Sequence, residues 1–345
     1  MTVALHYFRW AFLVTGGGLA AAFWLGWVQS GGLSGAAGFL LIGAILAVLE
    51  ISLSFDNAIV NANKLRTMTP LWQRRFLTWG ILIAVFGMRV IFPLLVVVIA
   101  AKIGPVAAVQ LAASQPAEYA RLIGEAHLGI AAFGGAFLMM VALTYFCDAG
   151  KDVDWIAALE RRMRRFASIR GLEMALVLAV ILVFTWILPA GEETTFLFAG
   201  VSGLVTFLGV EVLGHVLDAA EQTASLAARG GLGAFLYLEV LDASFSFDGV
   251  IGAFALTQNL FLIALGLGIG AMHVRSMTIM LVERGTLAQF RYLEHGAFWS
   301  ILVLSGIMFT QTLVHVPEVV TGLLGAGFIG LSLVSSIRHN RAAAA

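Results

Sequence analysis

The sequence predicts an all-α polytopic membrane protein of about ten transmembrane helices, built as two inverted-topology repeats. Three observations lead to this fold class. Of the 345 residues, 60% are hydrophobic and only 12% are charged, about half the charged share of a typical soluble chain. Ten apolar stretches are long enough to cross a bilayer. One acidic motif occurs in both the second and the seventh of these stretches.

The composition excludes several other classes of protein. The 20 basic and 20 acidic residues cancel to a formal net charge of +0, and Cys147 is the single cysteine. This balance argues against a soluble globular enzyme, a nucleic-acid-binding protein, a disordered chain and a disulfide-stapled secreted domain. We therefore expect a membrane protein that is not an enzyme and has no nucleic-acid partner.

Each helical crossing of a bilayer core needs roughly 20 apolar residues. The first apolar stretch is longer than the core of a typical signal peptide, so we expect a retained helix. The predicted spans are residues 10–29, 33–62, 77–100, 126–146, 172–190, 196–217, 231–257, 260–282, 297–316 and 317–337.

Basic residues set the expected orientation. Sixteen of the 20 Lys and Arg residues fall in segments that this prediction places on the cytoplasmic side, and two fall outside. This asymmetry predicts a multi-pass protein of the cell inner (plasma) membrane with both termini in the cytoplasm. The largest cytoplasmic loop, 147–171, predicts a basic amphipathic helix on the membrane surface. Anionic lipid headgroups are its expected partner, and a regulatory docking site is the alternative.

The acidic motif forms an internal repeat. Residues 49–57 (LEISLSFDN) and 241–249 (LDASFSFDG) are identical at five of nine positions, at an offset of 192. The two motif helices are five spans apart, so we expect them to cross the membrane in opposite directions. Inverted repeats of this kind, residues 1–171 and 172–345 within one transmembrane domain, are typical of secondary transporters whose site lies at the repeat interface.

Carboxylates inside predicted spans indicate a functional site, because each costs about 2.5–3.5 kcal/mol even on lenient insertion scales. On a continuous helix, Glu50 and Asp56 would point in different directions. Either each motif helix serves two polar interfaces, or it unwinds near residues 54–55 and 246–247 and frees carbonyls for a cation. The candidate metal ligands are Glu50, Asp56, Asn57, Glu239, Asp242 and Asp248.

These carboxylate and amide oxygens, supported by the hydroxyls of Ser54 and Ser246, suit a hard cation such as Mg²⁺, Ca²⁺ or Mn²⁺. His273 either adds a nitrogen ligand, which Mn²⁺ accepts better than Ca²⁺, or is a packed, hydrogen-bonded side chain. Two intramembrane arginines, Arg89 and Arg275, have two possible roles. They hold the bundle by snorkelling or pairing with a carboxylate, or they neutralise the acids when no metal is bound.

The motif Glu50-x-x-x-Ser54-Phe55-Asp56-Asn57 and its copy Asp242-x-x-x-Ser246-Phe247-Asp248-Gly249 resemble the TerC family, named for tellurium resistance, within the broad lysine-exporter-like superfamily. The long chain looks like a bacterial branch of unknown function. Family members are associated with manganese efflux, metal-ion homeostasis and tellurite resistance. The resemblance implies Mn²⁺ as the cation and the motif acids as its ligands. Gly249 stands where the first copy has Asn57, which makes the expected site asymmetric.

The leading hypothesis is a secondary transporter that exports a divalent cation, with Mn²⁺ first, and holds no permanent cofactor. No nucleotide-binding motif is present, so coupling to ions or protons is expected. One alternative is a membrane scaffold or accessory protein in metal or tellurite resistance. Another is an intramembrane aspartyl protease with Asp56 and Asp248 as a proton-sharing dyad.

Overall fold

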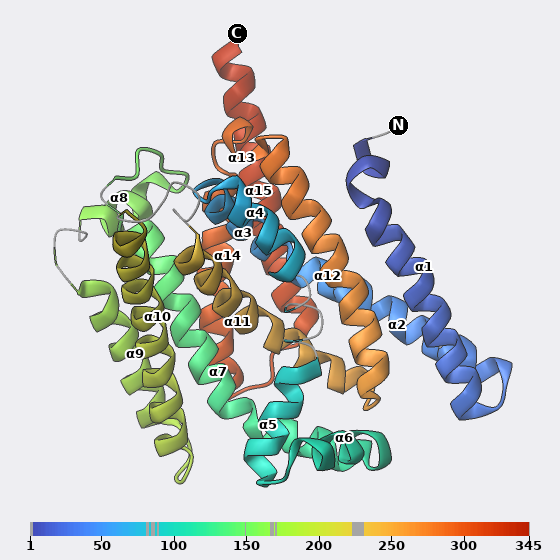
Figure 1. Cartoon of the computed structure of the whole chain (residues 1–345). Helices are drawn as coiled ribbons and strands as arrows, with labels where there is room; N and C mark the ends of the chain where they lie inside the picture. The colour runs from blue at the N-terminus through green and yellow to red at the C-terminus, as the bar shows by residue number, and fades with distance from the viewer. Residues whose placement is uncertain are drawn as a thin grey trace. The chain divides into compact units, whose positions relative to one another are not determined.

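The computed structural model of the chain describes residues 3–80, 83, 87, 90–148, 150–165, 169, 171–222 and 231–344 (Figure 1). Over these ranges the chain is helical and contains no β-strand. The helices are α1 Val3–Ser30, α2 Leu33–Leu53, α3 Phe55–Arg66, α4 Pro70–Arg75, the π-helix η1 Phe76–Gly80, α5 Phe92–Ala101, α6 Pro105–Ser114, α7 Pro116–Phe146, α8 Ala157–Arg165, α9 Leu172–Ile187, α10 Glu193–Gln222, α11 Leu232–Leu256, α12 Leu260–Glu283, α13 Thr286–Gln289, α14 Leu293–Gln311 and α15 Glu318–Ala344.

Within the described ranges, seven helices are long and apolar enough to cross a membrane. The predicted all-α class is therefore confirmed over the described residues, and the seven candidate spans fit a membrane protein. The ten crossings in two inverted repeats stay a prediction. α11 has a comparable length, 25 residues, but carries three acids along it, and α9 is shorter at 16 residues. The seven spans are Leu5–Ser30, Leu33–Leu53, Pro116–Phe146, Glu193–Gly214, Leu260–Glu283, Leu293–Gln311 and Val320–Ala342.

Three expected boundaries differ from the structure. The stretch 33–62 is two helices, α2 and α3, rather than one long span. The segment between the third and fourth predicted spans, 101–125, holds α6 and the first turns of α7. Both of these helices begin at a proline, a residue favoured at the first helical position because its ring presets the helical φ angle. Of the predicted span 77–100, residues 77–80 belong to η1 and residues 92–100 belong to α5.

The chain divides into two compact units, each assembled from separate segments. Unit 1 contains residues 1–54, 74–127 and 245–280, and unit 2 contains residues 55–73, 128–244 and 281–345. Each unit therefore draws on both sides of residue 171. The division into repeats at that residue stays a prediction.

In unit 1, helices approach closely where one partner has a glycine. α1 and α2 form a hairpin that turns at Gly31, whose φ of 67° lies in the left-handed region. Gly26 of α1 lies against α2, since a Cβ there would come within 2.9 Å of the Ala36 Cα atom. Gly266 and Gly270 of α12 face α2 in the same way. This spacing of small residues is the means by which membrane helices pack without bulky side chains between them.

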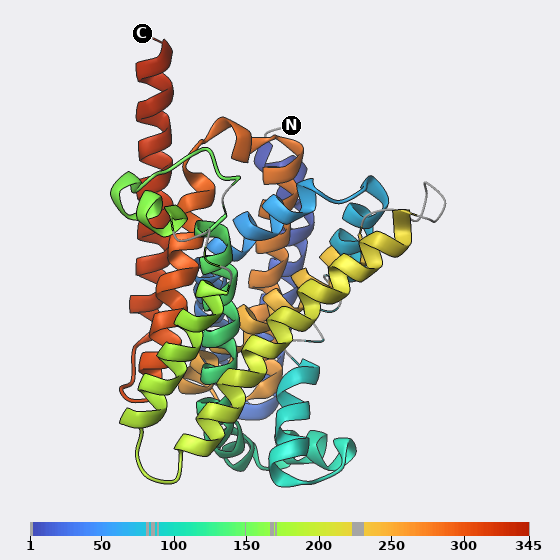
Figure 2. The same ribbon diagram turned by 90° about the vertical axis from the view of Figure 1, so that its left-hand side faces the viewer.

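In unit 2, α14 packs against both α15 and α3. It lies beside α15, and a Cβ on its Gly296 would come within 2.6 Å of Ser332 Cβ and 2.8 Å of the Phe328 carbonyl oxygen. α14 also contacts α3, with Glu294 near its start joined to Arg66 by a 3.0 Å ion pair. α9 and α10 form a hairpin whose two helices lie side by side in both ribbon views (Figures 1 and 2).

Candidate functional site

The first motif helix is interrupted inside the motif. α2 ends at Leu53, Ser54 has φ −100° and ψ 16°, and α3 begins at Phe55. The Ser54 N–H still donates to the Glu50 carbonyl oxygen at 3.0 Å. The interruption considered for both motif helices is present only in this copy, because α11 runs unbroken from Leu232 to Leu256.

The interruption places the two motif acids at helix ends of opposite polarity. Glu50 lies in the last turn of α2, where the helix macrodipole is negative, and Asp56 lies in the first turn of α3, where it is positive. Asp56 is therefore stabilised as an anion by its own helix. Glu50 receives no such help and is 1% exposed, so its charge has to be balanced by other groups, a proton or a cation.

In unit 1, Glu50 is surrounded by glycines. Ser54 Oγ donates to Glu50 Oε1 at 2.8 Å. A Cβ on Gly249 would lie 3.1 Å from Glu50 Oε2, and one on Gly270 would overlap the Glu50 side chain. The Glu50 carboxylate thus occupies the space that a side chain at position 249 would need. This accounts for the glycine at 249 where the first copy of the motif has Asn57.

In unit 2, both carboxylate oxygens of Asp56 are hydrogen-bonded. Ser300 Oγ of α14 donates to Oδ2 at 2.7 Å, and the Asn57 N–H donates to Oδ1 at 2.8 Å. Gly325 of α15 leaves room for this contact, since a Cβ there would lie 2.9 Å from Ser300 Oγ and 3.9 Å from Asp56 Oδ2. Asp56 is therefore held by hydrogen bonds from its own helix and from α14.

α3 and the first part of α11 are also neighbours in unit 2. Asn61 Nδ2 donates to Asp242 Oδ1 at 2.9 Å, and Lys64 Nζ lies 5.3 Å from the centre of the Tyr237 ring. These contacts follow opposite order along the two helices, so the helices are antiparallel. Asn57 lies one turn before Asn61, and Glu239 lies one turn before Asp242. The antiparallel arrangement puts Asn57 and Glu239 on opposite sides of the Asn61–Asp242 contact. We name this row of four buried residues, Asn57, Asn61, Glu239 and Asp242, the α3–α11 oxygen cluster.

The α3–α11 oxygen cluster has more acceptors than donors. Within the described residues, nine buried side-chain oxygen atoms lack a hydrogen-bond partner, and four of them belong to this cluster. They are Asn57 Oδ1, Asn61 Oδ1 and both carboxylate oxygens of Glu239. Each buried acceptor without a donor costs about 1–3 kcal/mol. A cation or a proton bound among these oxygens would remove that cost.

The donor set is two carboxylates and two amide oxygens, which are hard ligands. Among the described side chains, no three His, Cys, Asp or Glu residues are grouped as a metal site would group them. A cation held beside Glu239 and Asp242 would therefore take the Asn61 amide oxygen and water as its other ligands.

The remaining predicted site residues fall into two groups. Arg89 lies outside the described residues, and so does the side chain of Asp248, although its backbone belongs to α11. Ser246 Oγ is buried and has no hydrogen-bond partner among the described atoms. The roles predicted for these residues stay predictions.

Arg275 and His273 lie on α12 in unit 1. Arg275 donates from Nε and Nη2 to the Leu77 carbonyl oxygen, at 2.9 and 2.6 Å. His273 Nδ1 lies 3.1 Å from the Ile269 carbonyl oxygen, and its ring contacts Phe8 and Phe12 of α1. These are structural contacts of the kind expected for an arginine that holds the bundle and a packed histidine.

Sequence reasoning missed a buried group in the loop 147–171. Glu160 of α8 is fully buried and accepts hydrogen bonds from Lys151 Nζ at 2.8 Å and Trp299 Nε1 at 3.0 Å. His295 Nδ1 lies 2.8 Å from Glu160 Oε2, the same oxygen that accepts from Lys151. We name Lys151, Glu160, His295 and Trp299 the Glu160 cluster. The available signal was a single acid within residues 157–165, which carry four arginines.

The electrostatics of Glu160 follow from these contacts. Burial alone would raise the pKa of its carboxyl. Hydrogen bonds from His295, Lys151, Trp299 and the Ile156 N–H outweigh burial and hold the pKa well below its usual range. Glu160 is therefore an ionised anchor that ties the loop to α14.

Comparison with known proteins gives one match. Neither curated proteins nor solved structures yielded a match to this chain. A family model matches residues 55–343, which include α3, α11 and α14 and hence the α3–α11 oxygen cluster and Asp56. The chain belongs to the family described as "Protein of unknown function (DUF475)".

Proposed function

We propose that this protein is a secondary membrane transporter that exports a divalent metal cation, with Mn²⁺ as the first candidate. The observation that carries the proposal is the α3–α11 oxygen cluster, in which four buried acceptor atoms lack donors. Three of these atoms belong to Asn61, which contacts Asp242, and to Glu239, which lies one turn before Asp242. Glu239 and Asp242 together supply two negative charges, which one divalent cation balances. Buried charge without such compensation is strongly unfavourable.

The chemistry of the ligands supports a hard cation. Carboxylate and amide oxygens suit Mg²⁺, Ca²⁺ and Mn²⁺, and sulfur or imidazole clusters would have favoured softer metals. The resemblance of the two motifs to the TerC family favours Mn²⁺ among the three. The repeated sequence motif alone is the reason to propose Glu50 and Asp248 as ligands of a transported ion as well.

The interrupted helix fits this function as well. Broken helices place unsatisfied carbonyls and dipole ends near ion sites in many secondary transporters. The interruption at Ser54 leaves the last carbonyls of α2 without helical partners beyond the one that the Ser54 N–H satisfies. Such carbonyls add oxygen ligands at a point next to Glu50.

The architecture proposed with this function is ten crossings in two inverted repeats, with cytoplasmic termini in the inner membrane. The antiparallel contact of α3 with α11 supports it, because α3 carries the end of the first copy of the motif and α11 carries the second copy. Inverted repeats allow one bound ion to be exposed to each side in turn.

The test is metal flux in proteoliposomes that contain only this protein. An entrapped fluorophore quenched by Mn²⁺ reports entry, and Mg²⁺, Ca²⁺ and Zn²⁺ serve as competitors. Asp242→Asn keeps an oxygen for Asn61 but removes a charge, and we expect it and Glu239→Gln to lower flux at least about tenfold. The control is Glu192→Gln, an exposed acid in the loop between α9 and α10, which should transport normally.

Equal flux through Asp242→Asn and the parent would overturn the site. Absence of flux for every cation would instead favour the scaffold role. Cleavage of a membrane peptide that depends on Asp56 would favour the protease.

A further inference from the structure

α8 presents two chemically different faces. Its inner face holds Glu160, which is fully buried in the Glu160 cluster, and Arg164, whose Nη2 lies 2.8 Å from Asp154 Oδ2. The Trp155 and Ile156 N–H groups also donate to Glu160, at 3.2 and 3.1 Å. These contacts fix the rotation of the helix about its axis. The side chains on its other face therefore have a defined direction.

The Glu160 cluster also fixes the depth of α8. His295 and Trp299 lie in the first two turns of α14, a membrane-spanning helix. Lys151 Nζ lies 4.7 Å from the ring centre of Phe146, the last residue of α7. α8 is thus attached where two apolar helices end, and the ends of such helices lie at the level of the lipid headgroups.

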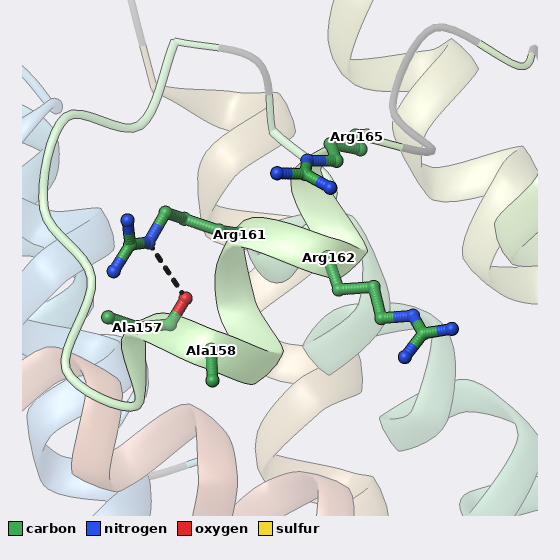
Figure 3. A pocket seen from close by; sticks show the side chains of 5 residues that line it. All are labelled: Ala157, Ala158, Arg161, Arg162 and Arg165. Carbon is green, nitrogen blue, oxygen red and sulfur yellow. Dashed lines mark hydrogen bonds between the residues drawn. The ribbon is translucent and has the colours of Figure 1, made fainter.

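The outer face of α8 is basic. A pocket of about 310 Å³ opens on it and is lined by Ala157, Ala158, Arg161, Arg162 and Arg165 (Figure 3). The three guanidinium groups extend from the helix in different directions. Arg161 Nε donates to the Ala157 carbonyl oxygen at 3.0 Å and also lies 3.9 Å from Asp154 Oδ2. Two neighbouring apolar side chains, Ile156 and Leu159, are 37% and 46% exposed.

We propose that α8 binds the phosphate groups of anionic phospholipids through Arg161, Arg162 and Arg165. Guanidinium groups bind phosphate oxygens in a planar, two-point geometry that ammonium groups lack. Exposed Ile156 and Leu159 at headgroup depth would contact the upper acyl chains, as in other interfacial helices. The inference does not depend on metal transport, because it rests on residues outside the α3–α11 oxygen cluster.

The test measures binding of fluorescently labelled phosphatidylglycerol to the full chain in a neutral detergent. Labelled phosphatidylcholine serves as the neutral-lipid comparison. Unlabelled inorganic phosphate is added as a competitor of phosphatidylglycerol. We expect phosphatidylglycerol to bind about tenfold tighter than phosphatidylcholine, and the preference to weaken as salt rises. Inorganic phosphate at millimolar concentration should not displace the lipid.

The variant is Arg161→Gln/Arg162→Gln/Arg165→Gln, which should lose the preference for phosphatidylglycerol. Its matched control, Arg74→Gln/Arg338→Gln/Arg341→Gln, removes three exposed basic side chains elsewhere and should keep it. If the first variant does not fold, the single change Arg162→Gln and the salt dependence of the parent carry the test. Equal binding of both lipids, displacement by phosphate, or equal loss in the control would overturn the proposal.

Discussion

Ser300 of α14 donates a hydrogen bond to Asp56 of α3 across 2.7 Å, and both side chains are buried. The preceding residue, Trp299, donates to Glu160 of α8 across 3.0 Å. One turn of α14 therefore holds two carboxylates that belong to different parts of unit 2. A substitution at Ser300 is therefore expected to affect α8 as well as α3, and a substitution at Trp299 is expected to affect α3 as well as α8.

Replacing Ser300 by Ala leaves Asp56 Oδ2 without this donor. We expect a loss of about 1–3 kcal/mol in the free energy of unfolding, because a buried acceptor loses its partner. Thermal or denaturant unfolding in detergent measures it. The matched control is Ser305→Ala on the same helix, whose buried hydroxyl donates only within α14, to the Leu302 carbonyl oxygen at 2.7 Å. Equal losses in the two variants would contradict a special role for the Asp56 contact.

Gly270→Ala is expected to destabilise the protein by about 1–3 kcal/mol, since the added Cβ overlaps Glu50 and forces α12 away from α2. Gly306→Ala, in the middle of α14, meets nothing within 4 Å. It should be neutral or stabilising by about 0.4–1 kcal/mol, as glycine replacements in open helical positions are. Comparison of the two unfolding midpoints checks the prediction. It is wrong if both alanines change the midpoint in the same direction by similar amounts.

The lowered pKa of Glu160 should make the free energy of unfolding depend on pH. Its pKa in the folded protein lies below the ordinary value of 4.5, so the unfolded chain takes up the proton first as pH falls. The stabilisation is complete above about pH 5 and declines below pH 4.5. We expect the unfolding midpoint of the parent to fall more steeply between pH 5 and pH 3.5 than that of Glu160→Gln. Parallel curves for the two proteins would show that Glu160 is not the ionised anchor.

Glu239→Gln is expected to have opposite effects with and without metal. In chelator, the variant should be as stable as the parent or more stable, because it removes a buried charge whose oxygens lack donors. With Mn²⁺ in excess, the parent should gain stability through binding and the variant should gain little. The measurement is the unfolding midpoint of the parent and of Glu239→Gln, each in chelator and in Mn²⁺. A Mn²⁺-dependent rise that is the same in both proteins would exclude Glu239 as a ligand.

Much of the fold follows from the sequence because bilayer constraints are local. A span needs a continuous apolar stretch whose backbone groups bond within the segment, so hydropathy alone locates it. Both α9 and α11 fall where apolar stretches were expected, at 172–190 and 231–257. The basic helix expected in the loop 147–171 is present as α8.

The site could be predicted only in part. The repeated motif identified Asp242 and Asn57, and Glu239 was recognised as a further carboxylate inside a predicted span. Ser300 could not be found, because a serine in an apolar helix commonly bonds to a carbonyl of its own helix, as Ser305 does. Its role depends on which helix lies opposite.

The sequence by itself determined that this chain is a bundle of apolar helices carrying two copies of an acidic motif. Only the tertiary structure decided that one motif helix is interrupted, that Gly249 makes room for Glu50, and that Glu160 is an anchor rather than a surface charge. The physical reason is that helix formation depends on residues three or four positions apart. The partner of a buried polar atom instead depends on which helices lie side by side, and residues hundreds of positions apart then share one contact.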